Sequence, residues 1–263
     1  MQWLLEPDLF GEGPHPLTEA VVAAGQRAIR WDDGWWSDPE RMPAPTDEPV
    51  VFHGGLGNAA RLRALDRWSP GALCNTTALA CSAYYPRVGR WLAAKRHLFS
   101  TVRELVASPE RVTAPLRECD RIFVRPDSPL KPFSGRVVAL DGLCADALDH
   151  GFYYDDLDLP IVVAAVEELG REWRLVVTPQ GIAAGSGYEA EGRGAGESVV
   201  PAAVRDLGEE ISRALEFPDP VVVIDVVETE AGLRLLELNP FSGADLYGCD
   251  LEAVVQAVTT AVG

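Results

Sequence analysis

The sequence predicts a mixed α/β fold, built from α+β lobes rather than from a regularly wound parallel sheet. Strand-like and helix-like segments follow one another irregularly along the 263 residues. Two late apolar segments, Val221 to Val227 and Leu233 to Leu238, have the pattern of an antiparallel hairpin. Neither GxGxxG nor GxxxxGK[ST] occurs in the chain. Dinucleotide-binding and P-loop folds therefore lose support.

The first hundred residues read as an irregular α/β unit without regular βαβ winding. Pro43 to Pro49 predicts an exposed loop, and Asp32 to Trp36 (DDGWW) a polar, aromatic one. Val50 to His53 predicts a short strand that runs into a glycine turn. Arg90 to Ala107 predicts one long helix. Its apolar stripe would consist of Trp91, Leu92, Leu98, Phe99, Val102, Leu105 and Val106.

Strands dominate the pattern from about Cys119 onward. The expected strands are Arg121 to Arg125, Arg136 to Leu140, Ile161 to Val166, Arg171 to Thr178 and Gly181 to Ser186. A loop from Pro126 to Gly135 separates the first two strands. Two helices complete the prediction, Pro201 to Leu215 and Leu251 to Val262, and Asp250 caps the second.

The bulk properties narrow the class of protein. A formal net charge of −17 gives no general attraction to nucleic acid or to anionic membranes, so we expect neither as a partner. The N-terminus lacks the pattern of a signal peptide, and no apolar run approaches the roughly 20 residues of a membrane span. Five cysteines without a CxxC pair suggest neither a disulfide framework nor a zinc site, and a cytoplasmic location is the simplest expectation. A homodimer stays open.

Polar side chains interrupt the late hairpin. Because side chains alternate along a strand, Glu237 and Asn239 share one face of theirs. A three-residue loop of Glu230, Ala231 and Gly232 would place Asp225 opposite Glu237. Two carboxylates and a carboxamide form an oxygen-rich site that suits Mg²⁺. The alternative interpretation is that Glu237 and Asn239 cap a strand end while Asp225 pairs with an arginine.

The Glu-x-Asn pattern, after a strand that carries an acid, resembles the metal motif of ATP-grasp enzymes. The resemblance covers roughly Arg121 to Gly263 and is greatest to small stand-alone ATP-grasp proteins related to the ribosomal-protein glutamate ligases. It implies an ATP-grasp fold, with two α+β subdomains gripping ATP after a small α/β N-terminal domain. The corresponding division is residues 1–100, 101–168 and 169–263. It also implies that Asp225, Glu237 and Asn239 bind two Mg²⁺ ions, for which Mn²⁺ can substitute.

The resemblance further assigns nucleotide contacts. Arg125 and Lys131 would bind ATP phosphates, although the family more often uses a Lys-Pro pair and a glycine-rich loop. A surface loop with solvated charges is the alternative. A hinge contacts the adenine in the family, and the ribose would be bound by an acid just after that hinge. Lys131 and Arg174 are the catalytic candidates, and a salt bridge is the alternative role for Arg174. The adenine and ribose candidates are Glu167, Glu168, Leu169 and Glu172.

Substrate contacts are the least determined. Tyr188 and Arg193 lie in or beside the glycine-rich stretch from Ala183 to Ser198, which reads equally well as a surface loop without function. Ser242 follows the metal motif and is a candidate to contact substrate. His53 ends a strand where the domain that precedes the ATP-grasp lobes often binds substrate.

The resulting hypothesis is an ATP-dependent carboxylate–amine ligase that works through an acyl phosphate on small-molecule or peptide substrates. Three alternatives stay open. They are a kinase on the same fold, a non-catalytic nucleotide-binding protein, and a metal-dependent hydrolase that does not use ATP.

Overall fold

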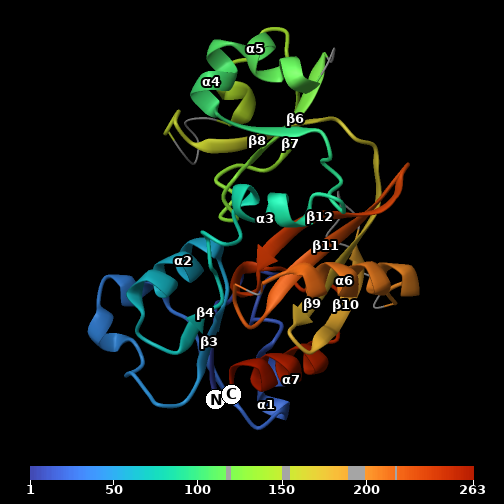
Figure 1. The fold of residues 1–263 in the computed structure, drawn as a ribbon. Helices are drawn as coiled ribbons and strands as arrows, with labels where there is room; N and C mark the ends of the chain where they lie inside the picture. Colours follow the sequence, from blue (N-terminus) through green and yellow to red (C-terminus); the bar gives the residue numbers. More distant parts are fainter. Residues whose placement is uncertain (117–119, 150–154, 189–198, 217) are drawn as a thin grey trace. The chain divides into compact units, whose positions relative to one another are not determined.

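The computed structural model describes residues 1–116, 120–149, 155–188, 199–216 and 218–263. The chain forms two compact units, and each combines segments that are distant in sequence. The first unit contains Met1–Asn75, Arg171–Val226 and Glu237–Gly263, and the second contains Thr76–Gly170 and Val227–Leu236. Figure 1 shows the helices and strands of both units.

A four-stranded parallel sheet with the order β2-β1-β3-β4 lies in the first unit. Two helices connect its strands in the sequences β1-α1-β2 and β3-α2-β4, so this part contains the βαβ winding that the sequence did not predict. The helices are short, and α1 has only six residues, which gave the sequence pattern little helical signal. These elements are β1 (Gln2–Leu5), α1 (Thr18–Ala23), β2 (Arg27–Arg30), β3 (Val50–His53), α2 (Leu56–Leu65) and β4 (Pro70–Ala72).

A second sheet has the strand order β10-β9-β11-β12. Two helices follow in sequence, and the predicted cap of the last one is confirmed, because the Asp250 carboxylate accepts a hydrogen bond from the Ala253 amide at 3.1 Å. The elements are β9 (Leu169–Thr178), β10 (Gly181–Tyr188), α6 (Ala202–Ala214), β11 (Val222–Thr229), β12 (Gly232–Pro240) and α7 (Leu251–Val262). A buried apolar cluster joins α1, α7 and the strands of both sheets in this unit.

The turn between β11 and β12 is shorter than expected. The strands run to Thr229 and from Gly232, so two residues rather than three connect them. Gly232 has a φ of 93°, a conformation that favours glycine, as the sequence suggested.

The second unit is built on an antiparallel sheet with the order β5-β8-β6-β7. One face of this sheet contributes Ile122, Val124, Ile161 and Val163 to a separate buried core, together with Val102 and Leu105. The elements are α3 (Cys81–Val88), β5 (His97–Thr101), α4 (Val102–Ala107), α5 (Pro109–Thr113), β6 (Arg121–Pro126), β7 (Arg136–Ala139) and β8 (Pro160–Ala165).

The long helix predicted over Arg90 to Ala107 is wrong. Its first part is irregular, its middle is the strand β5, and only α4 is helical. A capping box starts α4, since Thr101 and Glu104 exchange side-chain to backbone hydrogen bonds. Upstream of that cap, pairing of β5 with β8 overrides local helix propensity.

Five short 3-10 helices complete the description, and one of them occupies the DDGWW stretch that was expected to be a loop. Asp32 accepts a hydrogen bond from the Gly34 amide there and starts the turn. They are η1 (Asp33–Trp36), η2 (Pro39–Arg41), η3 (Ala114–Leu116), η4 (Ala145–Leu148) and η5 (Phe241–Gly243). Within the ranges that the structure describes, every helix is too short or too polar to cross a membrane.

Candidate functional site

The three predicted metal ligands lie together. The Nδ2 of Asn239 donates to Asp225 Oδ2 at 2.9 Å and to Glu237 Oε1 at 3.1 Å, so one amide links both carboxylates. Asp225 is fully buried, Asn239 is 5% exposed and Glu237 is half-buried. The convergence that the hairpin pattern predicted is therefore present in the folded chain. Both hydrogen bonds leave Asn239 through its nitrogen, which keeps its Oδ1 available as an acceptor.

Arg174 on β9 pairs with Asp225 through two parallel hydrogen bonds. The Nε and Nη2 of the guanidinium donate to the two carboxylate oxygens at 2.8 and 2.7 Å. The third nitrogen, Nη1, donates to the backbone oxygen of Asp245 at 2.8 Å. Burial opposes the charge of Arg174, but the adjacent Asp225 raises the pKa of the guanidinium well above its ordinary value. The alternative interpretation of Asp225, a pair with arginine, is thus realised in this structure.

A third acid approaches the same arginine. Glu172 precedes Arg174 by two positions on β9, so both side chains face the same way, and it is 7% exposed. Burial raises the pKa of Glu172, and the charges of Asp225 and Glu237 raise it further, against a hydrogen bond with Tyr188. We call the set Glu172, Arg174, Asp225, Glu237 and Asn239 the acidic cluster.

Two tyrosines cover one side of Arg174. The rings of Tyr188 and Tyr247 stack with centroids 4.5 Å apart, and the guanidinium carbon lies 5.4 Å from the first centroid and 4.8 Å from the second. These distances are within range of a cation–π contact. Tyr188 was a candidate to contact substrate, whereas Tyr247 had no assigned role. Nothing in the sequence separated Tyr247 from an ordinary loop residue, because its position depends on the backbone path after β12.

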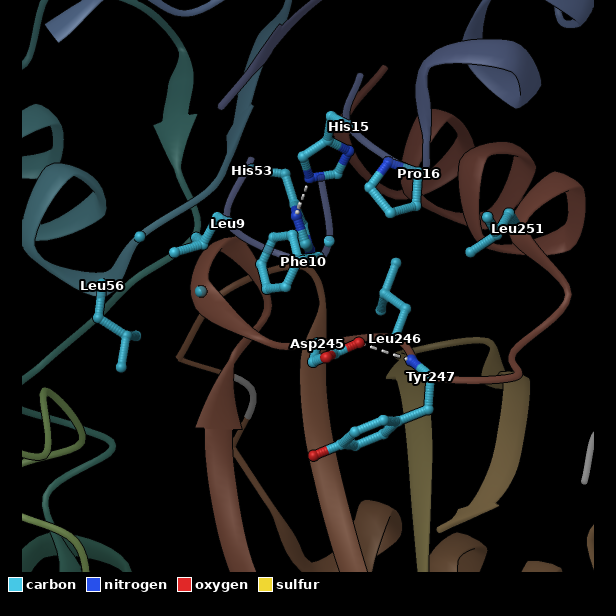
Figure 2. A pocket seen from close by; sticks show the side chains of 13 residues that line it. Leu9, Phe10, His15, Pro16, His53, Leu56, Asp245, Leu246, Tyr247 and Leu251 are labelled. Carbon is cyan, nitrogen blue, oxygen red and sulfur yellow. Dashed lines mark hydrogen bonds between the residues drawn. The ribbon is translucent and has the colours of Figure 1, made fainter. Parts of the chain in front are cut away.

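A cavity of about 620 Å³ lies in the first unit beside this backbone path. Figure 2 shows His15 and His53 at one end of it and Asp245 with Tyr247 at the other. The β1–β3 register places His53 beside Leu5 at the ends of their strands, which explains its position at the cavity. Its lining consists of Leu9, Phe10, Gly11, His15, Pro16, His53, Gly55, Leu56, Gly243, Asp245, Leu246, Tyr247 and Leu251.

The two histidines form a directed hydrogen-bond chain. The Leu17 amide donates to His15 Nδ1 at 3.1 Å, so that nitrogen carries no proton. The proton of a neutral His15 must then sit on Nε2, which lies 2.9 Å from His53 Nδ1. His53 Nδ1 accepts, and the proton of His53 sits on Nε2, a buried atom without a partner among the described residues. Burial lowers the pKa of His15 to about 4 and that of His53 well below its ordinary value, so both rings are neutral.

The candidates for nucleotide contacts belong mostly to the second unit. Arg125 is a buried residue of β6, and Lys131 lies in the loop between β6 and β7 with a φ of 49°. Glu167 and Glu168 are exposed after β8, and Leu169 begins β9. These positions keep the assigned nucleotide roles as predictions.

Ser242 and Arg193 were the other candidates for substrate contact. Ser242 is fully buried, its hydroxyl donates to the Phe52 oxygen at 2.6 Å and accepts from the Leu73 amide at 2.8 Å. This arrangement favours a structural role, in which the hydroxyl fixes the loop after β12 to β3. Arg193 lies outside the described residues.

A family model for an ATP-grasp domain, the third family of its clade, matches residues 60–258. The chain is a member of this family. Residues 60–258 include the acidic cluster, and the ATP-grasp fold predicted from Asp225, Glu237 and Asn239 is confirmed. A search of curated protein sequences finds no match.

Solved structures with the ATP-grasp fold align over nearly the whole chain. The D-cycloserine synthetase DcsG is 16% identical, with all of both chains covered and a TM-score of 0.62. A RimK domain ATP-grasp protein from Sphaerobacter thermophilus is 16% identical, with 97% of this chain and 98% of that chain covered and a TM-score of 0.59. The ATP-grasp ligase PsnB, solved with Mg and ADP, is 12% identical, with 100% and 97% covered and a TM-score of 0.57. PsnB has also been solved with a precursor peptide. At these identities the likeness shows the fold.

Proposed function

We propose that the chain is an ATP-dependent carboxylate–amine ligase that forms an amide through an acyl phosphate. The observation that carries this proposal is the charge of the acidic cluster. Three carboxylates, those of Glu172, Asp225 and Glu237, face one guanidinium, an excess of two negative charges when all are ionised. Such an excess in a largely buried place calls for an additional cation.

The chemistry of the donor set fits Mg²⁺. Oxygen ligands are what this ion prefers, and it usually takes only a few from protein and others from phosphate. Among the described residues, no group of three or more His, Cys, Asp or Glu side chains is placed to hold a metal, so Asn239 and the substrate phosphates would have to contribute. When bound, Mg²⁺ would neutralise phosphate charge. We assign Asp225, Glu237 and Asn239 to hold it.

The chain's own residues would supply position and positive charge. Arg174 has a permanent charge at the cluster and is fixed by Asp225, Asp245 and the two tyrosine rings, so it suits stabilisation of the transferred phosphoryl group. Arg125 and Lys131 are proposed to bind the ATP phosphates. Residues 167–169 are proposed to contact the adenine, and Glu172 or Glu168 the ribose.

The reaction needs no side-chain nucleophile. A substrate carboxylate oxygen attacks the γ-phosphorus of ATP, the bond to the β–γ bridging oxygen breaks, and ADP leaves. An amine then attacks the acyl carbon of the acyl phosphate, phosphate leaves with the bridging oxygen, and the nitrogen loses a proton. Each turnover therefore gives one amide, one ADP and one phosphate.

The test is the dependence of phosphate release on substrates. A ligase releases inorganic phosphate from Mg·ATP only when a carboxylate and an amine are both supplied, so pools of amino acids and short peptides should be tested in pairs. A kinase would form ADP and a phosphorylated product without free phosphate. That result, or the absence of Mg·ATP binding by calorimetry, would overturn the proposal.

One variant tests the site itself. Glu237→Gln keeps the size of the side chain and removes a negative charge, so Mg²⁺-dependent ATP binding should weaken by about tenfold or more, the effect of losing a charged ligand. Glu209→Gln is the matched control, because it removes the same charge from an exposed pair with Arg213 on α6. Equal ATP affinity of the two variants would remove Glu237 from the site.

A further inference from the structure

The cavity between His53 and Asp245 has a chemical character that selects for a kind of ligand. Most of its lining is apolar, with Leu9, Phe10, Leu56, Leu246 and Leu251 among the contributing side chains. Its volume of about 620 Å³ lies within the range typical of small-molecule sites. An apolar body of the size of an amino-acid side chain therefore fits the cavity and would be desolvated there.

One end of the cavity offers a hydrogen-bond donor. His53 is 1% exposed, and its Nε2 has no partner among the described residues. The chain from the Leu17 amide through His15 places the proton of His53 on this atom. A buried donor without a partner costs about 1–3 kcal/mol, which a ligand acceptor would recover. The ligand is therefore expected to carry an oxygen acceptor that receives this N–H.

The other end of the cavity carries a negative charge. Asp245 is the sole charged side chain among the described lining residues, and it is half-buried. Its Oδ1 accepts from the Tyr247 amide at 2.9 Å, which fixes the carboxylate in place. Since both histidines are neutral, no cation in the described lining offsets a bound anion. A carboxylate ligand would therefore be repelled and an ammonium attracted.

From these features we infer that the cavity binds the amine substrate, as an ammonium with an apolar body that carries a carbonyl or hydroxyl oxygen. The ammonium faces Asp245, the oxygen accepts from His53 Nε2, and the body contacts the leucines and Phe10. This inference rests on the proposed ligase function and assigns one of its two substrates to this site. The backbone links the cavity to the acidic cluster, because Arg174 Nη1 donates to the Asp245 oxygen.

Three probes with the same isobutyl body separate the determinants. Leucinamide has an ammonium and an amide oxygen, N-acetylleucinamide has amide oxygens without a charge, and N-acetylleucine has a carboxylate. Dissociation constants are measured by NMR titration of the full chain at pH 7, where an α-amine is mostly protonated. The titrations contain neither ATP nor Mg²⁺. They can therefore fail while ATP-dependent phosphate release succeeds, and the two proposals are refuted separately.

The expected order is leucinamide first, by about tenfold over N-acetylleucine. Asp245→Asn keeps an acceptor for the Tyr247 amide and should weaken leucinamide about tenfold without changing N-acetylleucinamide. The control is Asp250→Asn, which removes a nearby exposed charge that does not line the cavity while keeping a helix cap. It should leave all three affinities unchanged.

A histidine readout completes the test. Leucinamide should shift the Nε2–H resonance of His53, and His53→Phe should weaken leucinamide and N-acetylleucinamide equally. Three results would each overturn the inference. They are N-acetylleucine binding as tightly as leucinamide, equal effects of Asp245→Asn and Asp250→Asn, and no binding of any probe at millimolar concentration.

Discussion

Asp225→Asn should destabilise the metal-free protein by about 3 kcal/mol, because it leaves the Arg174 guanidinium buried without its counter-charge. Breaking a buried pair typically costs about 3–5 kcal/mol. The lower end applies here, since Arg174 keeps its hydrogen bond to the Asp245 oxygen and its contacts with two tyrosine rings. Asp225 is fully buried, so water cannot replace the lost partner.

The assay is urea unfolding in EDTA, followed by tryptophan fluorescence. Six of the seven tryptophans, all except Trp91, lie in the first unit with the pair, so the signal reports on the right part of the molecule. With a slope of about 3 kcal/mol per molar urea, the midpoint should fall by about 1 M. Glu209→Gln, which breaks an exposed pair in the same unit, should cost less than about 0.5 kcal/mol. A cost for Asp225→Asn as small as that of the control would refute the reasoning.

Two other substitutions test the surroundings of the cavity. His15 has a folded pKa of about 4 against 6.5 when unfolded, so the unfolded chain takes up the proton first and stability is lost as pH falls from 6.5 toward 4. His15→Asn should remove about 2 kcal/mol of this acid-dependent loss, measured by urea unfolding at both ends of that range, whereas His97→Gln should leave the pH dependence unchanged. Ser242→Ala should cost about 2 kcal/mol, because the buried Leu73 amide loses its acceptor, and the exposed Ser37→Ala is its control. Equal unfolding midpoints for the two serine variants would contradict the structural role of Ser242.

The sequence predicted best where local pattern and tertiary structure agree. The β11–β12 hairpin is continuous, apolar and punctuated by Gly232, so the alternation of its side chains alone assigns its polar residues to one face. The α7 helix was predictable for the same reason, with a cap at Asp250 and a clear apolar period. Both features depend on residues close in sequence.

Prediction failed where distant segments decide. The stretch from Arg90 to Ala107 has helical spacing, yet its middle pairs with β8, about 60 residues further along the chain. The contacts of Arg174 divide in the same way. Its pairing with Asp225 was foreseen as an alternative, because both carry opposite charges on apolar strands, whereas its contacts with Asp245 and Tyr247 required the path of the backbone after Asn239.

His15 could not be identified in advance. It lies in a loop without a recognisable motif, and its importance comes from a single hydrogen bond to His53, 38 positions away. The tautomer of His53, and hence the donor that it presents, is set by that bond. Such relations between loop residues leave no periodic signal in the sequence.

The two walls of the cavity differ in how freely evolution can change them. The wall from Gly243 to Leu251 is tied to the acidic cluster by Arg174 and, through Ser242, to the parallel sheet. The opposite wall contains Leu9, Phe10 and Gly11, in a mostly exposed loop closed by two hydrogen bonds between Asp8 and Gly13. Substitutions in that loop can reshape the cavity without disturbing the residues that handle phosphate. A lineage of such proteins can therefore acquire new acceptors through the loop while its chemistry stays the same.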